Sequence, residues 1–193
     1  MQRIAELQQL IADFAKVKRV LELANNGQLE NDVEHSYGLA LTCWFLAPKI
    51  APKLDLGKIL LYALAHDVVE LHSGDTYVFD KAGVETKAER EKAAIEQIKQ
   101  DWPDFPELVG AVIGYAEKHD AEAKFVYTVD KMLPPVLINL GEKERFWRKN
   151  KVTREMHEHE KSKKMQHSPE ALPYLDALNE WLSNPDYFYK PEA

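Results

Sequence analysis

Apolar residues recur at helical spacing in one segment after another along this chain. In residues 4–24 they occupy positions 4, 7, 10, 11, 14, 17 and 21, which lie on one face of an α-helix. Asn25-Asn26-Gly27 follows, and such residues commonly end a helix. Because no run of short alternating strands appears, we expect an all-α fold. The same pattern predicts further helices over residues 33–46, 56–71, 85–100, 108–117, 121–133, 136–149, 153–165 and 169–183.

Prolines and turn-forming residues mark the limits of these helices. We expect Asp32 to be the N-cap of the second helix and Ser73-Gly74-Asp75 to end the third. Pro134-Pro135 should break or kink the helix that begins at residue 121. No linker or repeat divides the chain, so the sequence predicts one compact domain. Its expected parts are residues 28–153 as the core, with a loop over 72–84, then helices over 153–183 and a tail over 184–193.

The composition limits the classes of partner. The net charge of −7 disfavours a long nucleic acid, which requires a broad basic face. No apolar run approaches the roughly 20 residues that span a bilayer, and the N-terminus has no apolar signal core. Cys43 is the single cysteine, so no intrachain disulfide can form. We therefore expect a cytoplasmic protein that binds neither nucleic acid nor membrane.

His66 and Asp67 stand together at the end of the apolar stretch 60–65. An imidazole and a carboxylate are costly to bury there unless something binds them, and a divalent cation is the obvious ligand. Glu70 follows three residues later, on the same face if the helix continues. It is a candidate for orienting a ligand or for acid–base chemistry.

Two further residues can complete such a site. His35 is expected in the first turn of its helix, and Asp130 is a single carboxylate in a mostly apolar helix. Taken alone, each has a simpler interpretation, a helix-start histidine or a solvent-facing charge. Together with His66 and Asp67 they form a mixed nitrogen and oxygen set that suits Mn²⁺, Fe²⁺ or Co²⁺. The set has no thiolate, which disfavours a structural zinc site.

These residues follow the order H…HD…D, which resembles the HD-domain superfamily of metal-dependent phosphohydrolases. The stretches ENDVEHSYGLAL, ALAHDVVELHSGDTYVFD and KAEREKAA are similar to a bacterial HD-hydrolase branch related to the 5′-deoxynucleotidases. The resemblance covers roughly residues 28–153. It implies a compact HD-domain helical bundle, a homodimer, and one divalent metal ion (Mn²⁺, Co²⁺ or Fe²⁺, with Mg²⁺ or Ni²⁺ as other options). The implied ligands are His35, His66, Asp67 and Asp130.

The resemblance also implies a reaction. The expected activity is that of a phosphomonoesterase that removes phosphate from nucleoside or deoxynucleoside 5′-monophosphates through metal-activated water. Glu70 and Asp75 match the acidic positions of the family and are the expected catalytic groups. Arg19 is the nearest candidate for the phosphate-binding arginine, while Tyr77 in the loop and Lys131 beside a ligand are candidates for substrate contact.

Two other functions remain open. The first is a different phosphohydrolase of the same superfamily, a diesterase or a triphosphohydrolase. The second is a metal-binding HD scaffold module without catalysis. Outside the site, His157 and His159 are expected on a solvated, charged helix, because their spacing places them on different faces. Trp44 and Phe45 are expected to make core or dimer contacts.

Overall fold

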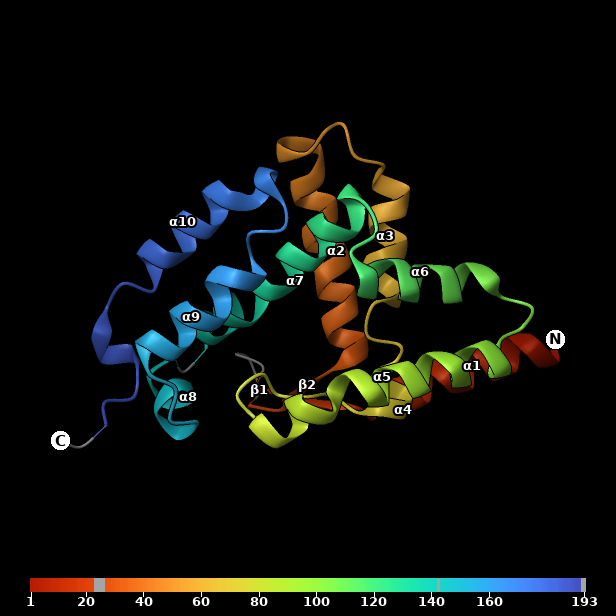
Figure 1. The fold of residues 1–193 in the computed structure, drawn as a ribbon, viewed down its shortest axis with the longest axis horizontal. Helices are drawn as coiled ribbons and strands as arrows, with labels where there is room; N and C mark the ends of the chain where they lie inside the picture. The colour runs from red at the N-terminus through yellow and green to blue at the C-terminus, as the bar shows by residue number, and fades with distance from the viewer. Residues whose placement is uncertain (23–26, 142, 192–193) are drawn as a thin grey trace.

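The computed structural model of the protein describes residues 1–22, 27–141 and 143–191. Helices form almost all of its regular structure, and one short hairpin accompanies them (Figure 1), so the all-α prediction is confirmed. Within the described residues, no helix is both long and apolar enough to cross a membrane. The elements are α1 (Gln2–Phe14), β1 (Lys18–Glu22), β2 (Leu29–Asn31), α2 (Asp32–Ile50), α3 (Leu56–Ala65), α4 (Glu70–Ser73), α5 (Lys81–Asp101), α6 (Pro106–Glu117), α7 (Ala121–Leu140), α8 (Lys143–Lys149), α9 (Arg154–Lys164), η1 (Pro169–Ala171), α10 (Leu172–Trp181) and η2 (Pro185–Tyr187).

The first predicted helix is wrong beyond residue 14. Helix α1 ends at Phe14, and β1 pairs antiparallel with β2, with Lys18 opposite Asn31. Leu21 then packs in a cluster with Trp147, far along the chain, while Phe14 belongs to another cluster. A continuous helix could not serve both clusters, so tertiary packing overrides the local pattern. Asn25 and Asn26, the predicted helix end, lie outside the described residues.

Helix α2 begins one residue earlier than predicted. Asn31, not Asp32, is the N-cap, and its side chain accepts hydrogen bonds from the backbone N–H groups of Val33 (3.0 Å) and Glu34 (3.1 Å). The Glu34 carboxylate in turn accepts from the Asn31 backbone N–H at 2.9 Å, which completes a capping box. Asp32 is therefore a helical residue, and its side chain is fully buried. This placement frees the Asp32 carboxylate for the site described below.

Helix α3 ends at Ala65, directly before His66, and does not continue to residue 71 as predicted. The chain then tightens into a turn, with hydrogen bonds from Val68 N to Ala65 O (3.1 Å) and from Glu70 N to Asp67 O (2.8 Å). These i to i+3 bonds replace the regular i to i+4 pattern. The predicted loop over residues 72–84 is shorter than expected, because α4 and α5 leave only 74–80 between them.

Helix α7 runs through Pro134 and Pro135, so the predicted break there is wrong, while the alternative of a kink stays a prediction. Each proline removes one backbone hydrogen bond. Pro135 and Ile138 are nevertheless buried, so core packing offsets that loss. Residues 136–140 belong to α7, and α8 is a separate helix. The helices predicted over 85–100, 108–117 and 153–165 are present as α5, α6 and α9, and 169–183 as η1 with α10.

Asp120 caps the other end of α7 by accepting a hydrogen bond from the Ala123 N–H at 2.9 Å. Partial burial alone would raise its pKa, but hydrogen bonds from Lys58 and Ala123, with one from the Tyr62 hydroxyl, outweigh that effect. The net result lowers the pKa of Asp120 to about 2. The cap thus connects the start of α7 to α3.

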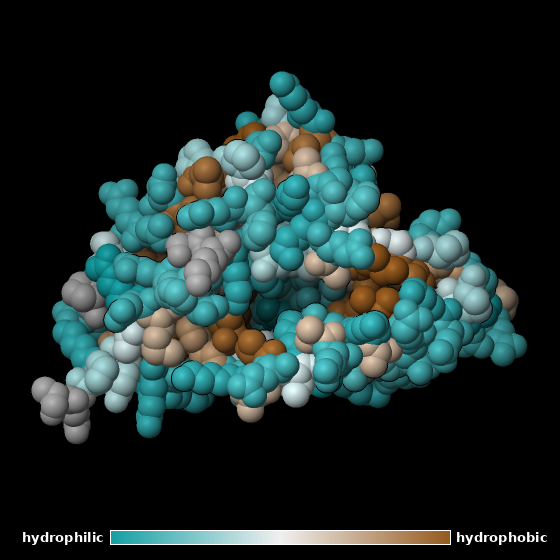
Figure 2. All heavy atoms as spheres, viewed as in Figure 1, coloured by the Kyte–Doolittle hydropathy of each residue, from teal (hydrophilic) through white to brown (hydrophobic). Residues whose placement is uncertain are grey.

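The C-terminal segment is not a free tail. The Phe188 side chain is buried and its ring stacks on Trp147 at 5.2 Å between centroids, while Tyr189 N donates to Val152 O at 3.0 Å. His157 is buried against the same tryptophan, at 5.0 Å, so its prediction as a solvated residue is wrong. A cavity of about 570 Å³ lies between α5, α7, α8, α9 and the loop after α4. Figure 2 shows a hollow near the middle of the face in view.

Candidate metal centre and cleft

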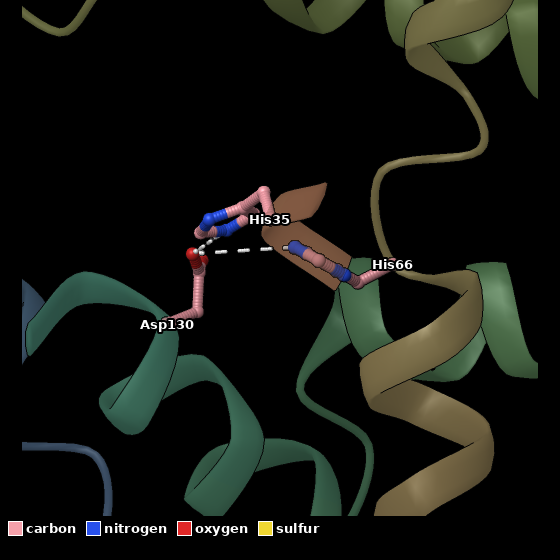
Figure 3. Close-up of side chains that lie close together, drawn as sticks. All are labelled: His35, His66 and Asp130. Carbon is pink, nitrogen blue, oxygen red and sulfur yellow. Dashed lines mark hydrogen bonds and ion pairs between the residues drawn. The ribbon is translucent and has the colours of Figure 1, made fainter. Parts of the chain in front are cut away.

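Three of the predicted ligands converge in the centre of the molecule. His35 comes from α2, His66 from the end of α3 and Asp130 from α7 (Figure 3). His35 Nε2 lies 3.0 Å and His66 Nε2 4.0 Å from Asp130 Oδ1. All three side chains are buried, and their ligand atoms are close enough together to hold one metal ion.

Asp67 brings a fourth ligand atom to the same place. Its Oδ2 lies 3.0 Å from His66 Nε2 and 4.0 Å from His35 Nε2. Ligand atoms roughly 2.1 Å from an octahedral ion lie about 3.0 Å apart when adjacent and about 4.2 Å apart when opposite. The four separations of 3.0 and 4.0 Å lie near these values. His35, His66 and Asp130 form one group of mutually close ligand atoms, whereas Asp67 contacts this group through the two histidines and is grouped with Asp32 and Glu70.

The hydrogen bonding of His66 leaves its Nε2 available as a metal ligand. Its Nδ1 lies 2.9 Å from the Ala63 carbonyl oxygen, which can only accept, so Nδ1 carries the proton. The Nε2 lone pair then faces Asp67 Oδ2, and Nε2 is buried without a hydrogen-bond partner among the described residues. A lone pair beside a carboxylate oxygen is unfavourable, and either a proton on Nε2 or a bound metal ion would relieve it. The residues present thus fit a divalent metal ion with mixed nitrogen and oxygen ligands.

Asp130 is oriented by two neighbours on its other oxygen. The Tyr115 hydroxyl donates to Asp130 Oδ2 at 2.6 Å, and Lys131 Nζ lies 2.6 Å from the same atom. These contacts leave Oδ1 directed toward His35. Lys131, predicted to contact substrate, lies in the cleft beside the ligand cluster. Tyr115 was not predicted, because a tyrosine in an apolar helix gives no signal that separates it from an ordinary core residue.

A second group of carboxylates adjoins the first. Oxygens of Asp32, Asp67 and Glu70 lie within 4.8 Å of one another. Burial raises the pKa of Glu70 well above its usual range, and the charges of Asp67 and Asp75 raise it further. Burial and the Asp67 carboxylate likewise raise the pKa of Asp32. Cations bound nearby would oppose both shifts. Sequence reasoning missed Asp32 in this role because it was assigned to the helix cap.

Arg19 is the counter-ion of this acidic group. From β1 its guanidinium reaches Asp67 Oδ2 at 2.9 Å, Glu30 Oε2 at 3.2 Å, Asp32 Oδ1 at 3.5 Å and Asp75 Oδ1 at 3.9 Å. Only the hairpin, which the helical pattern did not predict, allows residue 19 to lie here. The predicted phosphate contact of Arg19 thus competes with four carboxylates, although the side chain also lines the cleft.

Acidic, lysine and aromatic side chains all line the cleft. His66, Asp67 and Glu70 lie among the residues that line the cavity of about 570 Å³. Tyr77 lines it as predicted, and its ring packs edge-on against Phe79 at 5.4 Å. Figure 2 shows the hollow with hydrophilic and hydrophobic surface around it. The lysines that line the cavity are Lys87, Lys92, Lys118, Lys131 and Lys164.

Lys118 and Lys131 lie on the same aromatic ring of the cleft. Its Nζ lies 4.3 Å from the centroid of the Tyr127 ring, and Lys131 Nζ lies 5.3 Å from the same ring. Partial burial lowers the pKa of Lys118, and the neighbouring charge of Lys131 lowers it further. An anionic group bound between the two lysines would relieve this repulsion.

Known proteins share this fold and parts of this sequence. A family model for the HD domain matches residues 12–172. The 5′-deoxynucleotidase HDDC2 of Xenopus laevis is 32% identical over 104 residues, which make up 53% of this chain and 50% of that protein. The chain thus spans about half the length of this curated relative.

Solved structures extend the likeness over nearly the whole chain. The crystal structure of a predicted metal-dependent phosphohydrolase from Magnetospirillum magnetotacticum MS-1 has a TM-score of 0.82 at 24% identity, covering 97% of this chain and 96% of that one. The PH0347 protein from Pyrococcus horikoshii OT3 has a TM-score of 0.62 at 20% identity, covering 92% and 97%. At these identities the two structures establish a shared fold.

Proposed function

The chain belongs to the HD-domain family, and on that premise we propose that it is a metal-dependent phosphomonoesterase that acts on nucleoside or deoxynucleoside 5′-monophosphates. The unbonded Nε2 of His66, buried opposite Asp67 Oδ2 in the cleft, is the observation that carries this proposal. Such an arrangement is costly in a protein that binds no cation. The 5′-deoxynucleotidase activity named for the Xenopus laevis relative supports the choice of substrate.

In this proposal His35, His66, Asp67 and Asp130 would hold one divalent ion, and a different residue would transfer the proton. A bound ion supplies Lewis acidity toward a phosphoryl oxygen and lowers the pKa of a water molecule toward neutrality. Glu70 is the better candidate for the proton-handling group, because it lines the cleft and its buried Oε2 has no hydrogen-bond partner among the described residues.

The walls of the cleft suit a nucleotide. Lys131 places a positive charge beside the ligand cluster, and Lys118 adds a second one in the same cleft, where the phosphate of a monoester would lie. Tyr77 and Phe79 present aromatic surface on which a base can stack. The cavity of about 570 Å³ is within the usual range for small-molecule sites.

Phosphate release with and without metal tests the proposal. Purified protein would be assayed with ribonucleoside and deoxynucleoside 5′-monophosphates, the corresponding di- and triphosphates, and a phosphodiester. Each substrate would be tested with Mn²⁺, Co²⁺, Mg²⁺ or EDTA. We expect metal-dependent turnover of the monophosphates. Faster turnover of diesters or triphosphates would identify another phosphohydrolase, and absence of turnover on every ester would identify a scaffold module.

Asp67→Asn removes a charged ligand while it preserves side-chain shape. We expect it to lose both bound metal and activity, measured by metal analysis and phosphate release. Asp176→Asn makes the same chemical change at an exposed position on α10 and should have no effect on either quantity. Full activity of the Asp67 variant would contradict the assigned role.

A further inference from the structure

The cavity of about 570 Å³ extends from the metal centre along α7. Lys131, next to the proposed ligand Asp130, lines the cavity, and so do Pro134 and Ile138 further along the same helix. At a rise of about 1.5 Å per residue, Asp130 and Ile138 are about 12 Å apart along the helix axis. The cavity is therefore elongated, and an extended nucleoside 5′-monophosphate can reach from the metal centre to Ile138.

Aromatic side chains surround the cavity at its Ile138 end. Ile138 and Trp147 belong to one buried cluster. Phe79 and Phe146 pack against that cluster, and Tyr77 contacts Phe79 edge-on at 5.4 Å between ring centroids. All four aromatic side chains line the cavity. We call Tyr77, Phe79, Phe146 and Trp147 the aromatic end of the cleft.

Two buried donors at the aromatic end have no hydrogen-bond partner among the residues that the structure describes. They are the indole Nε1 of Trp147, a side chain that is 2% exposed, and the hydroxyl of Tyr77. An indole N–H can only donate. Burial raises the pKa of Tyr77 to about 12, so its hydroxyl also keeps a proton to donate near neutral pH. Buried donors are costly without an acceptor, and a ligand in the cavity can supply one.

The surrounding structure holds both donors in place. Phe188 stacks on the indole of Trp147 at 5.2 Å between centroids, with 29° between the ring planes. Arg90 anchors the segment that carries Tyr77, because its guanidinium donates to Thr76 Oγ1 at 2.8 Å. Donors that are fixed in advance lose little conformational freedom when a ligand binds.

We propose that the aromatic end binds the nucleobase and selects bases with a carbonyl group, rather than an amino group, at the edge farthest from the sugar. This inference rests on the proposed function, which puts the phosphate at the metal centre and hence the base at the other end. Uracil, thymine and hypoxanthine carry a carbonyl oxygen at that edge, which can accept from Trp147 or Tyr77. Cytosine and adenine carry an amino group there, which would leave those donors unpaired.

Two pairs of nucleotide analogues isolate this choice. The uridine and cytidine 5′-phosphonates, in which a methylene group replaces the ester oxygen, cannot be hydrolysed, and the inosine and adenosine analogues form the second pair. Isothermal titration calorimetry with the Mn²⁺-loaded protein measures the dissociation constant of each analogue without turnover. We expect the carbonyl member of each pair to bind at least about 10-fold more tightly than the amino member.

Trp147→Phe and Tyr77→Phe each keep an aromatic ring and remove one donor. Each should lower the preference for the carbonyl member at least about threefold, because the amino group then leaves fewer donors unpaired. Trp102→Phe is the matched control, because Trp102 is buried in a different cluster and does not line the cavity. Its preference should equal that of wild type. Circular dichroism checks the fold, and Tyr77→Phe carries the test alone if Trp147→Phe does not fold.

Equal affinity for both members of each pair overturns the inference, and so does the absence of binding of all four analogues. A wild-type preference in folded Trp147→Phe and Tyr77→Phe, or an equal loss in Trp102→Phe, also overturns it. The proposed function fails by a different result. A protein that prefers the carbonyl analogues but hydrolyses no 5′-monophosphate would support the base site and refute the phosphatase.

Discussion

Tyr115→Phe removes one hydroxyl group beside the metal centre and nothing else. The ring that packs edge-on against His66 at 5.0 Å is retained, while the 2.6 Å hydrogen bond to Asp130 Oδ2 is lost. A hydrogen bond to a charged group contributes about 1.5–3 kcal/mol, and loss of a partner that orients a ligand weakens metal binding roughly 10- to 100-fold. Lys131 still binds the same oxygen, so we expect metal affinity to fall about 10-fold.

Competition with a metallochromic chelator measures this loss as the change in dissociation constant for Mn²⁺ or Co²⁺. Tyr127→Phe is the control: its ring lies 5.9 Å from that of Tyr115, but within the described part of the chain its hydroxyl makes no hydrogen bond. Metal affinity within twofold of wild type in the Tyr115 variant would refute the reasoning. An equal loss in the control would also refute it, because the effect would then not depend on Asp130.

Three further predictions concern the scaffold. Asp120→Ala should lower the free energy of unfolding by about 1 kcal/mol through loss of the α7 cap. Asp120→Asn keeps the cap but removes the charge, so its free energy of unfolding should be lower than that of wild type above pH 3.8. This difference should vanish as the pH falls to about 2, because the carboxylate has a depressed pKa in the folded protein. A difference that does not change with pH in chemical denaturation would contradict this. Cys43 is fully buried, which raises the pKa of its thiol, so it should react with a maleimide only after unfolding, and rapid labelling of native protein would contradict the packing. Gly114→Ala would place a Cβ 2.8 Å from the Tyr62 hydroxyl and should lower the free energy of unfolding by about 1–3 kcal/mol, measured by thermal unfolding. Gly110→Ala is the control, because a Cβ there meets no neighbouring atom within 4 Å. An equal loss in the control would refute the steric argument.

The metal centre shows how far local sequence reasoning reaches. His35, His66, Asp67 and Asp130 stand out in the sequence because each is polar within or beside an apolar segment, where burial without a partner is costly. The structure brings their ligand atoms together, although His35 and Asp130 are 95 residues apart in the chain. Their role as ligands is a proposal that metal analysis of the variants will test.

The contacts that neighbouring residues make with these ligands could not be predicted from the sequence in the same way. Tyr115 looks like any core tyrosine and Asp32 like a helix cap, while Arg19 was expected to bind phosphate and not to pair with the carboxylates of the site. Each acquires its role from a contact that spans a long stretch of chain, such as the 2.9 Å pair between Arg19 and Asp67. Sequence periodicity reports only on neighbours within about one or two turns.

The sequence by itself determined the helical class of the fold, because apolar spacing at the helical period is a local property that each segment carries alone. It also determined which polar residues are too costly to bury without a ligand. Only the tertiary structure decided where the helices stop, as at Phe14 and Ala65, and that residues 18–22 pair as a strand. Those outcomes depend on which distant surfaces each segment can cover, and packing free energy of that kind exceeds the small differences in local propensity.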